Sequence, residues 1–279
     1  MTLIRKPAVA GSFYPGEKDQ LNSQLDNFLQ QAKTVSQLGN LKILIVPHAG
    51  IIFSGRTAAW GFKQIEGKDY RRIILLGASH TAWFDHAAVF SKGTWETPLG
   101  KVNVDEDLVS QILDKQEKIV SDLNPHWQEH DLEVEVIFLQ KVLKNFKIVP
   151  ILISDQNNQL IESLANKIKG NLDEQTLLVI SSDLSHYPDY QTANKVDSQT
   201  IQSILSGRKK VFEQTIQSFE TLNYPGLETA ACGYQTIRVG LKIGEELHLK
   251  WKKIFYENSG DVSGDRSRVV GYTSIIAYI

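Results

Sequence analysis

The stretch Thr176-Leu-Leu-Val-Ile-Ser-Ser-Asp183-Leu-Ser-His186 passes from a short apolar run directly into an aspartate and a histidine. Two earlier stretches share this form, Leu41-Lys-Ile-Leu-Ile-Val-Pro-His48 and Arg72-Ile-Ile-Leu-Leu-Gly-Ala-Ser-His80. Short apolar runs of this kind are typical of strands that are buried on both faces of a mainly parallel sheet. The three stretches therefore predict an α/β fold in which their strands are neighbours in the sheet.

Helix-like and strand-like patterns alternate over the rest of the chain. Apolar spacing and capping residues predict helices over 18–34, 54–64, 105–114, 131–145 and 158–170, two helices over roughly 190–218, and another starting near Thr229. Further strands are expected near 87–90 and over 147–153, 249–256 and 269–277, with loops in 81–104 and 259–265. Because the sequence has no repeat or linker, we expect one domain over 1–279, and the late strands predict a mixed sheet.

The composition limits the classes of function. The 279 residues are 42% hydrophobic, which suffices for one large α/β domain. The formal net charge is −2 and no long basic run occurs, so nucleic acid is not indicated as a partner. Cys232 is the single cysteine, which excludes an intrachain disulfide. Neither a membrane-spanning stretch nor a signal peptide is recognisable, so we expect a cytoplasmic protein without a membrane partner.

The polar residues that follow the three predicted strands are candidates for one functional site. Ligands of open α/β sheets bind at the carboxyl ends of the strands, so His48, His80, Asp183 and His186 are expected to converge. Imidazole and carboxylate groups bind transition metals and move protons near neutral pH. A helical turn after the third strand would place Asp183 and His186 on one side. The alternative is structural, with the histidines held in turns and Ser182 or Asp183 capping a helix beside an exposed His186.

Two further groups lie outside these strands. Cys232 is placed at the start of the helix predicted from Thr229; a lone cysteine is commonly a small buried residue, whereas a helix N-terminus favours the thiolate. Glu129 and Glu133 share a helix face, which a solvated surface explains, and a position of Glu129 and His130 beside the pocket is the alternative. Three histidines lack supporting context and are expected to be surface or structural residues: His86, His126 and His248.

A series of motifs along the chain resembles the Memo family, which includes the AmmeMemoRadiSam system protein B group of bacteria and archaea. The matching motifs are Pro7-Ala-Val-Ala-Gly-Ser-Phe-Tyr-Pro15, Val46-Pro-His-Ala-Gly50, Leu76-Gly-Ala-Ser-His80, Thr97-Pro-Leu-Gly100, Glu129-His130, Ser181-Ser-Asp-Leu-Ser-His-Tyr187, Ala231-Cys-Gly233, Gly260-Asp-Val-Ser-Gly-Asp265 and Arg268-Val-Val-Gly-Tyr272. They span nearly the whole chain, and so many motifs in order are far more specific than any one of them.

The resemblance implies a fold and a set of site residues. The Memo family looks like the class III extradiol dioxygenases, whose fold is a three-layer α/β/α sandwich around a mixed, mainly parallel sheet. In those dioxygenases two histidines and a glutamate hold non-haem ferrous iron, and another histidine acts as a base. By position, His48 and His80 match the two histidine ligands, and Cys232 stands where the family has a cysteine in place of the glutamate. His186 matches the base, and Asp183 matches the family's adjacent aspartate.

Departures from the family pattern concern the surroundings of this site. Ala78 replaces a common proline, and the helix Asp131-Leu-Glu-Val-Glu-Val-Ile-Phe138 is more acidic and lacks the usual proline. The implied ligand set indicates iron first, with copper or zinc as alternatives, because a thiolate shifts the preference toward softer or borderline metals. An open position on zinc would suit a hydrolase. Without a metal, Cys232, His186 and Asp183 could form a nucleophile, a base and an orienting group.

Two classes of function stay open from the sequence. One is a metal-dependent redox enzyme that acts on an unknown small molecule or on a modified protein or RNA group. The other is a non-enzymatic protein that binds a metal or a peptide with a vestigial active site. Polar groups at strand and helix ends favour the enzyme, because an inert scaffold has no need of them. The resemblance also implies a radical-SAM protein and an AMMECR-domain protein as partners.

Overall fold

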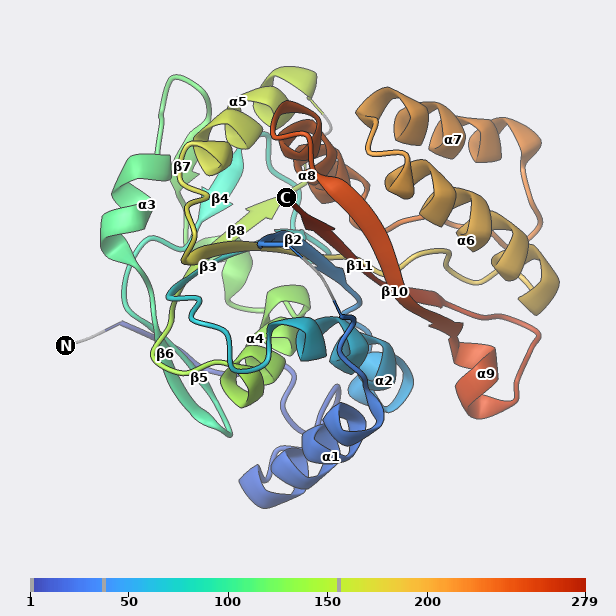
Figure 1. The fold of residues 1–279 in the computed structure, drawn as a ribbon, viewed down its shortest axis with the longest axis horizontal. Coiled ribbons are helices and arrows are strands. Elements are labelled where there is room, and N and C mark those ends of the chain that lie inside the picture. The colour runs from blue at the N-terminus through green and yellow to red at the C-terminus, as the bar shows by residue number, and fades with distance from the viewer. Residues whose placement is uncertain (1–2, 37–38, 155–156) are drawn as a thin grey trace.

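A mixed sheet of eight strands forms the centre of the part of the chain that the computed structural model describes, residues 3–36, 39–154 and 157–279 (Figure 1). The strand order is β10-β11-β2-β9-β3-β8-β4-β7. The strands are β2 (Leu41–Val46), β3 (Arg72–Ala78), β4 (Ala87–Val89), β7 (Ile119–Ser121), β8 (Lys147–Ile153), β9 (Thr176–Ser181), β10 (Lys250–Asn258) and β11 (Gly271–Tyr278). The α/β fold predicted from the sequence is thereby confirmed.

The central strands β2, β9, β3 and β8 run parallel, and β9 lies between β2 and β3. Every residue of β2 and β9 is buried, as expected for strands that are covered on both faces. β11 is antiparallel to both β10 and β2, and β4 is antiparallel to β8, which makes the sheet mixed. Because β2, β9 and β3 point the same way, their carboxyl ends lie at one edge of the sheet.

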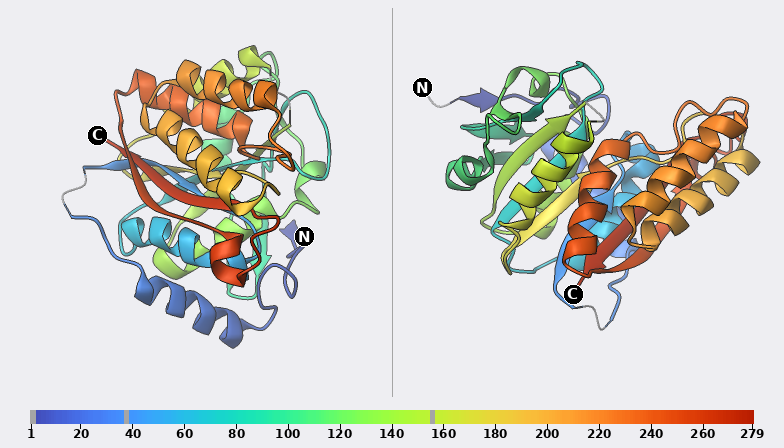
Figure 2. Two further views of the ribbon diagram at one scale, coloured as in Figure 1. Left: turned by 90° about the vertical axis from the view of Figure 1, so that its right-hand side faces the viewer. Right: turned by 90° about the horizontal axis from the view of Figure 1, so that it is seen from above.

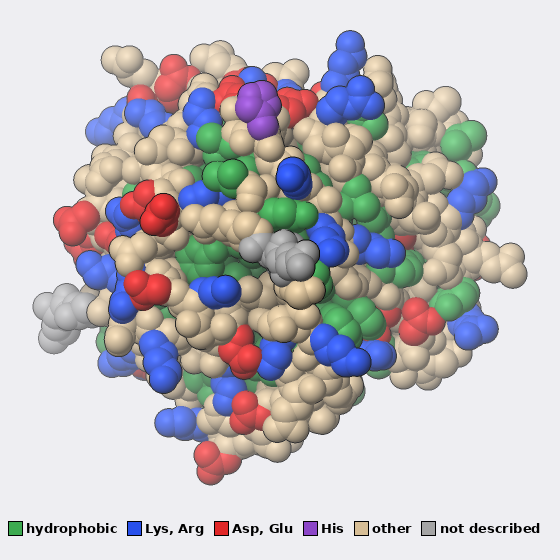
Figure 3. Space-filling model, in the orientation of Figure 1, with side chains coloured by type: hydrophobic (Ala, Val, Ile, Leu, Met, Phe, Trp, Pro, Cys, Tyr) green, Lys and Arg blue, Asp and Glu red, His purple; other side chains and the backbone are tan. Residues whose placement is uncertain are grey.

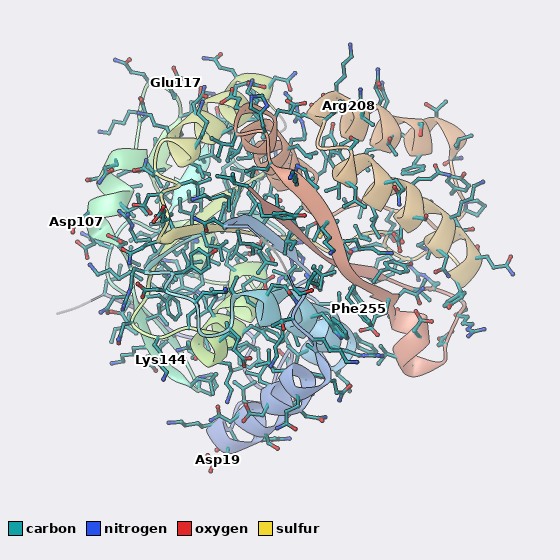
Figure 4. The ribbon with its side chains drawn as sticks, viewed as in Figure 1. Asp19, Asp107, Glu117, Lys144, Arg208 and Phe255 are labelled. Atoms are coloured by element: carbon teal, nitrogen blue, oxygen red, sulfur yellow. The ribbon has the colours of Figure 1, made fainter. Side chains whose placement is uncertain are left out.

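Helices cover both faces of this sheet and form the outer layers of a sandwich (Figure 1, Figure 2). They are α1 (Lys18–Gln31), α2 (Ile51–Phe62), α3 (Glu106–Ile112), α4 (Asp131–Val142), α5 (Asn158–Lys169), α6 (Tyr190–Leu205), α7 (Lys209–Leu222), α8 (Tyr234–Glu246) and α9 (Ser259–Ser263). On one face α2 and α4 pack on the sheet, with α1 outside them; on the other face α8 packs on β3 and β9 beside α5 and α7. Phe255 of β10, which is labelled in Figure 4, stacks on Trp60 of α2 with ring centroids 5.1 Å apart.

Charged side chains of both signs are interspersed on the face drawn in Figure 3. This mixture agrees with the formal net charge of −2 and presents no broad field of one sign on that face. Among the helices that the structure describes, none combines the length and the apolar character needed to cross a bilayer.

A second, three-stranded sheet occupies part of the region 81–104, which the sequence predicts to be loops. It contains β1 (Ile4–Arg5), β5 (Thr94–Thr97) and β6 (Gly100–Asn103), with β5 parallel to β1 and antiparallel to β6. Its anchor is Trp95, whose ring lies 4.3 Å from the guanidinium carbon of Arg5. The loop prediction fails here because strands this short have too few residues for an alternating pattern to be recognised.

Two predicted helix starts are wrong. α2 begins at Ile51 rather than at Ser54, whose hydroxyl donates to the Ala49 carbonyl at 2.7 Å instead of capping the helix. α8 begins at Tyr234 rather than near Thr229. Thr229 instead pairs with the segment after β9, so the residues around Cys232 are held by tertiary contacts and not by a helix.

The predicted loop 259–265 contains the short helix α9. Asn258 caps it and Asp261 completes a capping box, in which each side chain accepts a hydrogen bond from the backbone of the other residue. The predicted cap at Asp105 is confirmed, because its carboxylate accepts from the backbone N–H of Leu108 at 3.2 Å.

Candidate functional site

The carboxyl ends of β2, β3 and β9 bring four of the predicted site residues together. His48 follows β2, His80 follows β3, and Asp183 and His186 follow β9. The rings of His48 and His80 meet edge to face, with centroids 5.0 Å apart. Asp183 Oδ2 lies 4.0 Å from His48 Nε2 and 3.9 Å from His186 Nε2. Side chains from three separate strands thus form one cluster.

A third histidine, His130, belongs to the same cluster. It directly precedes α4, and its ring centroid lies 5.4 Å from that of His48 and 4.7 Å from that of His80. Phe13 also packs against the His130 ring, at 4.7 Å between centroids. Sequence reasoning placed His130 only at the border of the site, and the pair Glu129-His130 at a helix start was the signal available.

Two sets of ligand atoms that include His48 are close enough to hold a metal ion. One nitrogen each from His48, His80 and His130 lie within 4.8 Å of one another, and so do ligand atoms of His48, Asp183 and Cys232. Among the described residues no such set contains both His80 and Cys232. The three ligands implied by the family resemblance, His48, His80 and Cys232, therefore do not all lie within this distance of one another. His48 belongs to both sets, one of which contains His80 and the other Cys232.

His48 is almost fully buried, at 1% exposure. Its Nδ1 lies 2.8 Å from the Ser181 hydroxyl oxygen, and its Nε2 lies 3.4 Å from Cys232 Sγ. Its backbone N–H donates to Asp183 Oδ1 at 2.9 Å. Burial, and then the imidazole of His80, hold the pKa of His48 well below its usual range. The ring is therefore neutral at cellular pH, which is the form that binds a metal.

One buried carboxylate holds both His80 and His130. Glu129 Oε1 lies 3.0 Å from Nδ1 of each ring, and Oε2 accepts from the His80 backbone N–H at 2.6 Å. Burial raises the pKa of Glu129, but hydrogen bonds from His130 and His80 outweigh burial and bring the pKa below its usual range. Ionised Glu129 thus keeps each Nδ1–H toward itself and leaves Nε2 of both rings for a ligand. The expectation of a solvated Glu129 is wrong.

A buried ion pair from the N-terminal segment supports Glu129. Arg5 pairs with Glu133, and both side chains are fully buried. Arg5 also donates to the backbone carbonyl of Glu129 at 2.5 Å, and the Tyr14 hydroxyl donates to Glu133 at 2.5 Å. The expectation that Glu133 lies on a solvated face is wrong, because its partner Arg5 arrives from a segment 128 residues away in the sequence.

Cys232 is partly buried and faces His48 and Asp183. Its sulfur accepts from the backbone N–H of Asp183 at 3.2 Å. Burial, and then the negative charge of Asp183, raise the pKa of the Cys232 thiol well above its usual range. The expected help from a helix N-terminus is missing, because α8 begins only at Tyr234. A cation beside the sulfur would favour the thiolate, which is the form that binds metals.

Asp183 and His186 lie on an irregular segment rather than on a helical turn. The His186 N–H donates to the Thr229 carbonyl at 2.9 Å, and within the described chain His186 Nε2 has no hydrogen-bond partner. Burial raises the pKa of Asp183 and lowers the pKa of His186, and the opposite charge of the neighbour works against both shifts. A helix cap by Ser182 or Asp183 is excluded, because no helix follows β9 before Tyr190 in this fully described stretch.

The remaining histidines have the structural surroundings expected of them. His126 is fully buried, its Nε2 lies 3.0 Å from the Ala88 carbonyl oxygen, and burial lowers its pKa to about 3. His86 Nε2 lies 3.1 Å from the Asp122 carboxylate. His248 lies between α8 and β10 in a left-handed backbone conformation, with φ of 53°.

The sandwich fold and the histidine-rich end of its sheet define an α/β protein with a site that could hold a metal ion. Residues 5–276 match the family described as Memo-like protein. The chain therefore belongs to the Memo family.

Relatives match over nearly the whole of both chains. A MEMO1 family protein of Thermoplasma volcanium is 34% identical, over 99% of this chain and 98% of the relative. MEMO1 family proteins of Nitrosopumilus maritimus and Thermotoga neapolitana are 33% and 34% identical, each over 98% of this chain and 99% of the relative. An uncharacterized protein of Escherichia coli K12 has a similar crystal structure, with a TM-score of 0.54 at 12% identity over 86% of this chain and 100% of that chain. The last match shows a likeness of fold alone.

Proposed function

We propose that this Memo-family protein is a metal-dependent redox enzyme that acts on a small molecule, with the site inside a single domain. The observation that carries the proposal is the approach of His48 Nε2 to Cys232 Sγ, at 3.4 Å, beside the rings of His80 and His130. Nitrogen and sulfur donors that converge from rigid strand ends suit a first-row transition metal.

The donor set fits such a metal. We assign His48, His80 and Cys232 as the ligands, as the family resemblance implies, with iron as the first choice and copper or zinc as alternatives. Ser181 and Glu129 hold the Nδ1 atoms of the two rings, which leaves the Nε2 atoms for the metal. A bound redox metal would supply electron exchange with the substrate.

His130 is the competing third ligand. Its ring nitrogen lies within 4.8 Å of nitrogens of His48 and His80, whereas no set within this distance among the described residues joins His80 to Cys232.

His186 and Asp183 handle protons in this proposal. His186 Nε2 lies 3.9 Å from Asp183 Oδ2 and has no hydrogen-bond partner among the described residues, so it is free to accept a proton from a substrate. Burial keeps the pKa of His186 below its usual range, which leaves the ring neutral and able to act as a base at cellular pH. Asp183 meanwhile accepts from the His48 backbone N–H and so fixes the turn that carries that ligand.

One observation favours a second function, the binding of a peptide without turnover. Trp83 is 78% exposed and follows His80 by three residues, and Ile52 is 66% exposed and follows His48 by four. Exposed large apolar side chains that follow site residues in sequence suit contact with an apolar segment of a partner.

Metal content tests the main proposal. The protein is purified without air or chelator, and its metal is measured by elemental analysis in the wild type and in His48→Ala, His80→Ala, Cys232→Ser and His130→Ala variants. We expect a transition metal near one equivalent in the wild type, a loss in the first three variants, and retention in His130→Ala. A loss in His130→Ala with retention in Cys232→Ser would make His130 the third ligand. Full metal content in a triple His48, His80 and Cys232 variant would overturn the proposed site.

A further inference from the structure

We propose that Glu135 is a positioning residue for His48: acting through the Ser181 hydroxyl, it keeps the imidazole proton on Nδ1 and the lone pair on Nε2. The inference deepens the proposed function, and its link to metal binding rests on His48 being a ligand. The helix that carries Glu135 is the same one whose acidic sequence departs from the family pattern.

The Ser181 hydroxyl is the junction of this arrangement. Its oxygen lies 2.8 Å from His48 Nδ1, 2.7 Å from Glu135 Oε1 and 3.3 Å from the backbone carbonyl oxygen of Asp131. Ser181 is the last residue of β9, and Glu135 lies on the second turn of α4. The strand end and the helix thus bring a carboxyl group to the far side of a hydroxyl that touches the ring.

The number of protons decides the direction of these bonds. A serine hydroxyl has one hydrogen to donate and two lone pairs to accept with. The shorter of its two contacts to oxygen is the one to Glu135, so the hydroxyl hydrogen points there. His48 Nδ1 must then donate to Ser181, because the hydroxyl has no hydrogen left for it. A neutral imidazole with Nδ1–H carries its lone pair on Nε2, which faces Cys232.

Glu135 has no other role that the described contacts reveal. It is fully buried in α4, and within the described residues its Oε2 has no hydrogen-bond partner. The buried guanidinium of Arg5 pairs with Glu133. A buried carboxyl group is costly unless it makes a specific bond, and the bond to Ser181 is the one it makes.

The positioning requires Glu135 Oε1 to act as an acceptor. Burial raises the pKa of its carboxyl group well above the usual range, so the neutral acid must be considered. The carboxylate meets this requirement, and so does the neutral acid when its proton is on Oε2, which has no partner among the described residues. A glutamine meets the requirement through its amide oxygen.

Nuclear magnetic resonance of metal-free protein tests the inference directly. The protein is labelled with ¹⁵N in histidine, and the ring nitrogens of His48 are assigned by their loss in His48→Gln. We expect the wild type and Glu135→Gln to show His48 with Nδ1 protonated and Nε2 bare. Glu135→Leu should give a mixture of tautomers, and Ser181→Ala should give a mixture as well.

A double variant separates positioning from a general effect on the core. In the Ser181→Ala background, Glu135→Leu should cause no further change in the His48 signals, because the path from Glu135 to the ring is already cut. An unchanged tautomer in Glu135→Leu, or an equal change with and without Ser181, would overturn the inference. Should Glu135→Leu fail to fold, Glu135→Met offers an unbranched apolar replacement for the same comparison.

Zinc titration connects this result to the proposed function. Glu135→Leu should weaken zinc binding by about 10- to 100-fold, which is the usual effect of removing a residue that orients a metal ligand without touching the metal. Glu135→Gln should bind zinc as tightly as the wild type does. A wild type that binds no metal, together with the tautomer change in Glu135→Leu, would reject the metal site and keep the positioning role. Normal zinc binding and an unchanged tautomer in Glu135→Leu would reject the positioning role of Glu135 and keep the metal site.

Discussion

His48 Nε2 and Cys232 Sγ lie 3.4 Å apart, although 184 residues separate them along the chain. The strand order explains this contact. β2 ends just before His48 and is the direct neighbour of β9, and the segment after β9 carries Asp183, whose N–H donates to the sulfur at 3.2 Å. The contact therefore depends on sheet pairing and not on any local sequence.

Glu129→Gln should weaken metal binding by about 10- to 100-fold, because an amide cannot accept from both Nδ1–H groups as strongly as the carboxylate does. The affinity is measured by titration of metal-free protein with zinc or cobalt. Glu96→Gln is the matched control, since that glutamate pairs with Lys6 outside the site. Equal affinities in the two variants would show that Glu129 does not orient the rings.

Glu133→Ala should destabilise the fold by about 3–5 kcal/mol, because it leaves the buried guanidinium of Arg5 without its partner. Urea denaturation followed by circular dichroism measures the free energy of unfolding. The more exposed pair Lys6–Glu96 offers the comparison, and Lys6→Ala should change stability by less than about 1 kcal/mol. A loss below 1 kcal/mol in Glu133→Ala would mean that the ion pair is not a structural anchor.

Gly77→Ala should destabilise the protein by about 1–3 kcal/mol, because an added methyl group at this end of β3 would overlap the Asp131 carboxylate. Asp131 opens α4 directly after His130, so the ring should also lose its fixed position. Thermal unfolding measures the stability. In Gly170→Ala the added methyl meets only ordinary contacts at the end of α5, so that variant should stay within about 0.5 kcal/mol of the wild type.

Asp197→Asn should flatten the dependence of stability on pH. Burial raises the pKa of Asp197 from 3.8 to about 6, so the folded protein holds this proton more tightly than the unfolded chain does. The resulting contribution is fully present below pH 3.8 and is lost as the pH rises through about 6, which amounts to on the order of 3 kcal/mol. Asparagine stays neutral and can still accept from the Ser185 N–H, so the variant does not lose this stability as the pH rises.

Urea midpoints recorded between about pH 4 and pH 7 check this prediction. The wild type should lose stability across the range relative to Asp197→Asn, whereas the exposed Asp265→Asn should follow the wild type. Parallel curves for wild type and Asp197→Asn would show that Asp197 ionises in the folded protein without penalty.

His186→Gln should leave the metal content intact and abolish turnover, once a substrate is found, because the side chain is assigned to proton transfer and not to ligation. Elemental analysis and circular dichroism accompany the activity measurement. Metal loss with an intact fold would make His186 a ligand, and unchanged activity would leave it without a role in catalysis.

The central strands and the polar residues at their ends could be predicted because both depend on local sequence. Each strand is a short apolar run, and His48, His80 and Asp183 follow directly from it. The direction of parallel strands then places these residues at one edge of the sheet. No knowledge of distant contacts is required for that step.

The burial of the glutamates in and just before α4 could not be predicted, because their partners come from elsewhere in the chain. Glu129 and Glu133 have the i, i+4 spacing of a solvated helix face, yet both are buried, and so is Glu135. Their partners are His80 after β3, Arg5 of β1 and Ser181 of β9 respectively. Periodicity alone cannot distinguish carboxylates that face water from carboxylates that face remote donors.

The place of β11 in the sheet also has a consequence for the folding of the protein during its synthesis on the ribosome. β11 (Gly271–Tyr278) pairs with β2, which emerges from the ribosome far earlier. At usual synthesis rates the apolar edge of β2 waits on the order of tens of seconds for this partner. During that time the nascent chain exposes a strand edge that invites pairing with other chains, so chaperones that shield such edges should govern its yield in cells.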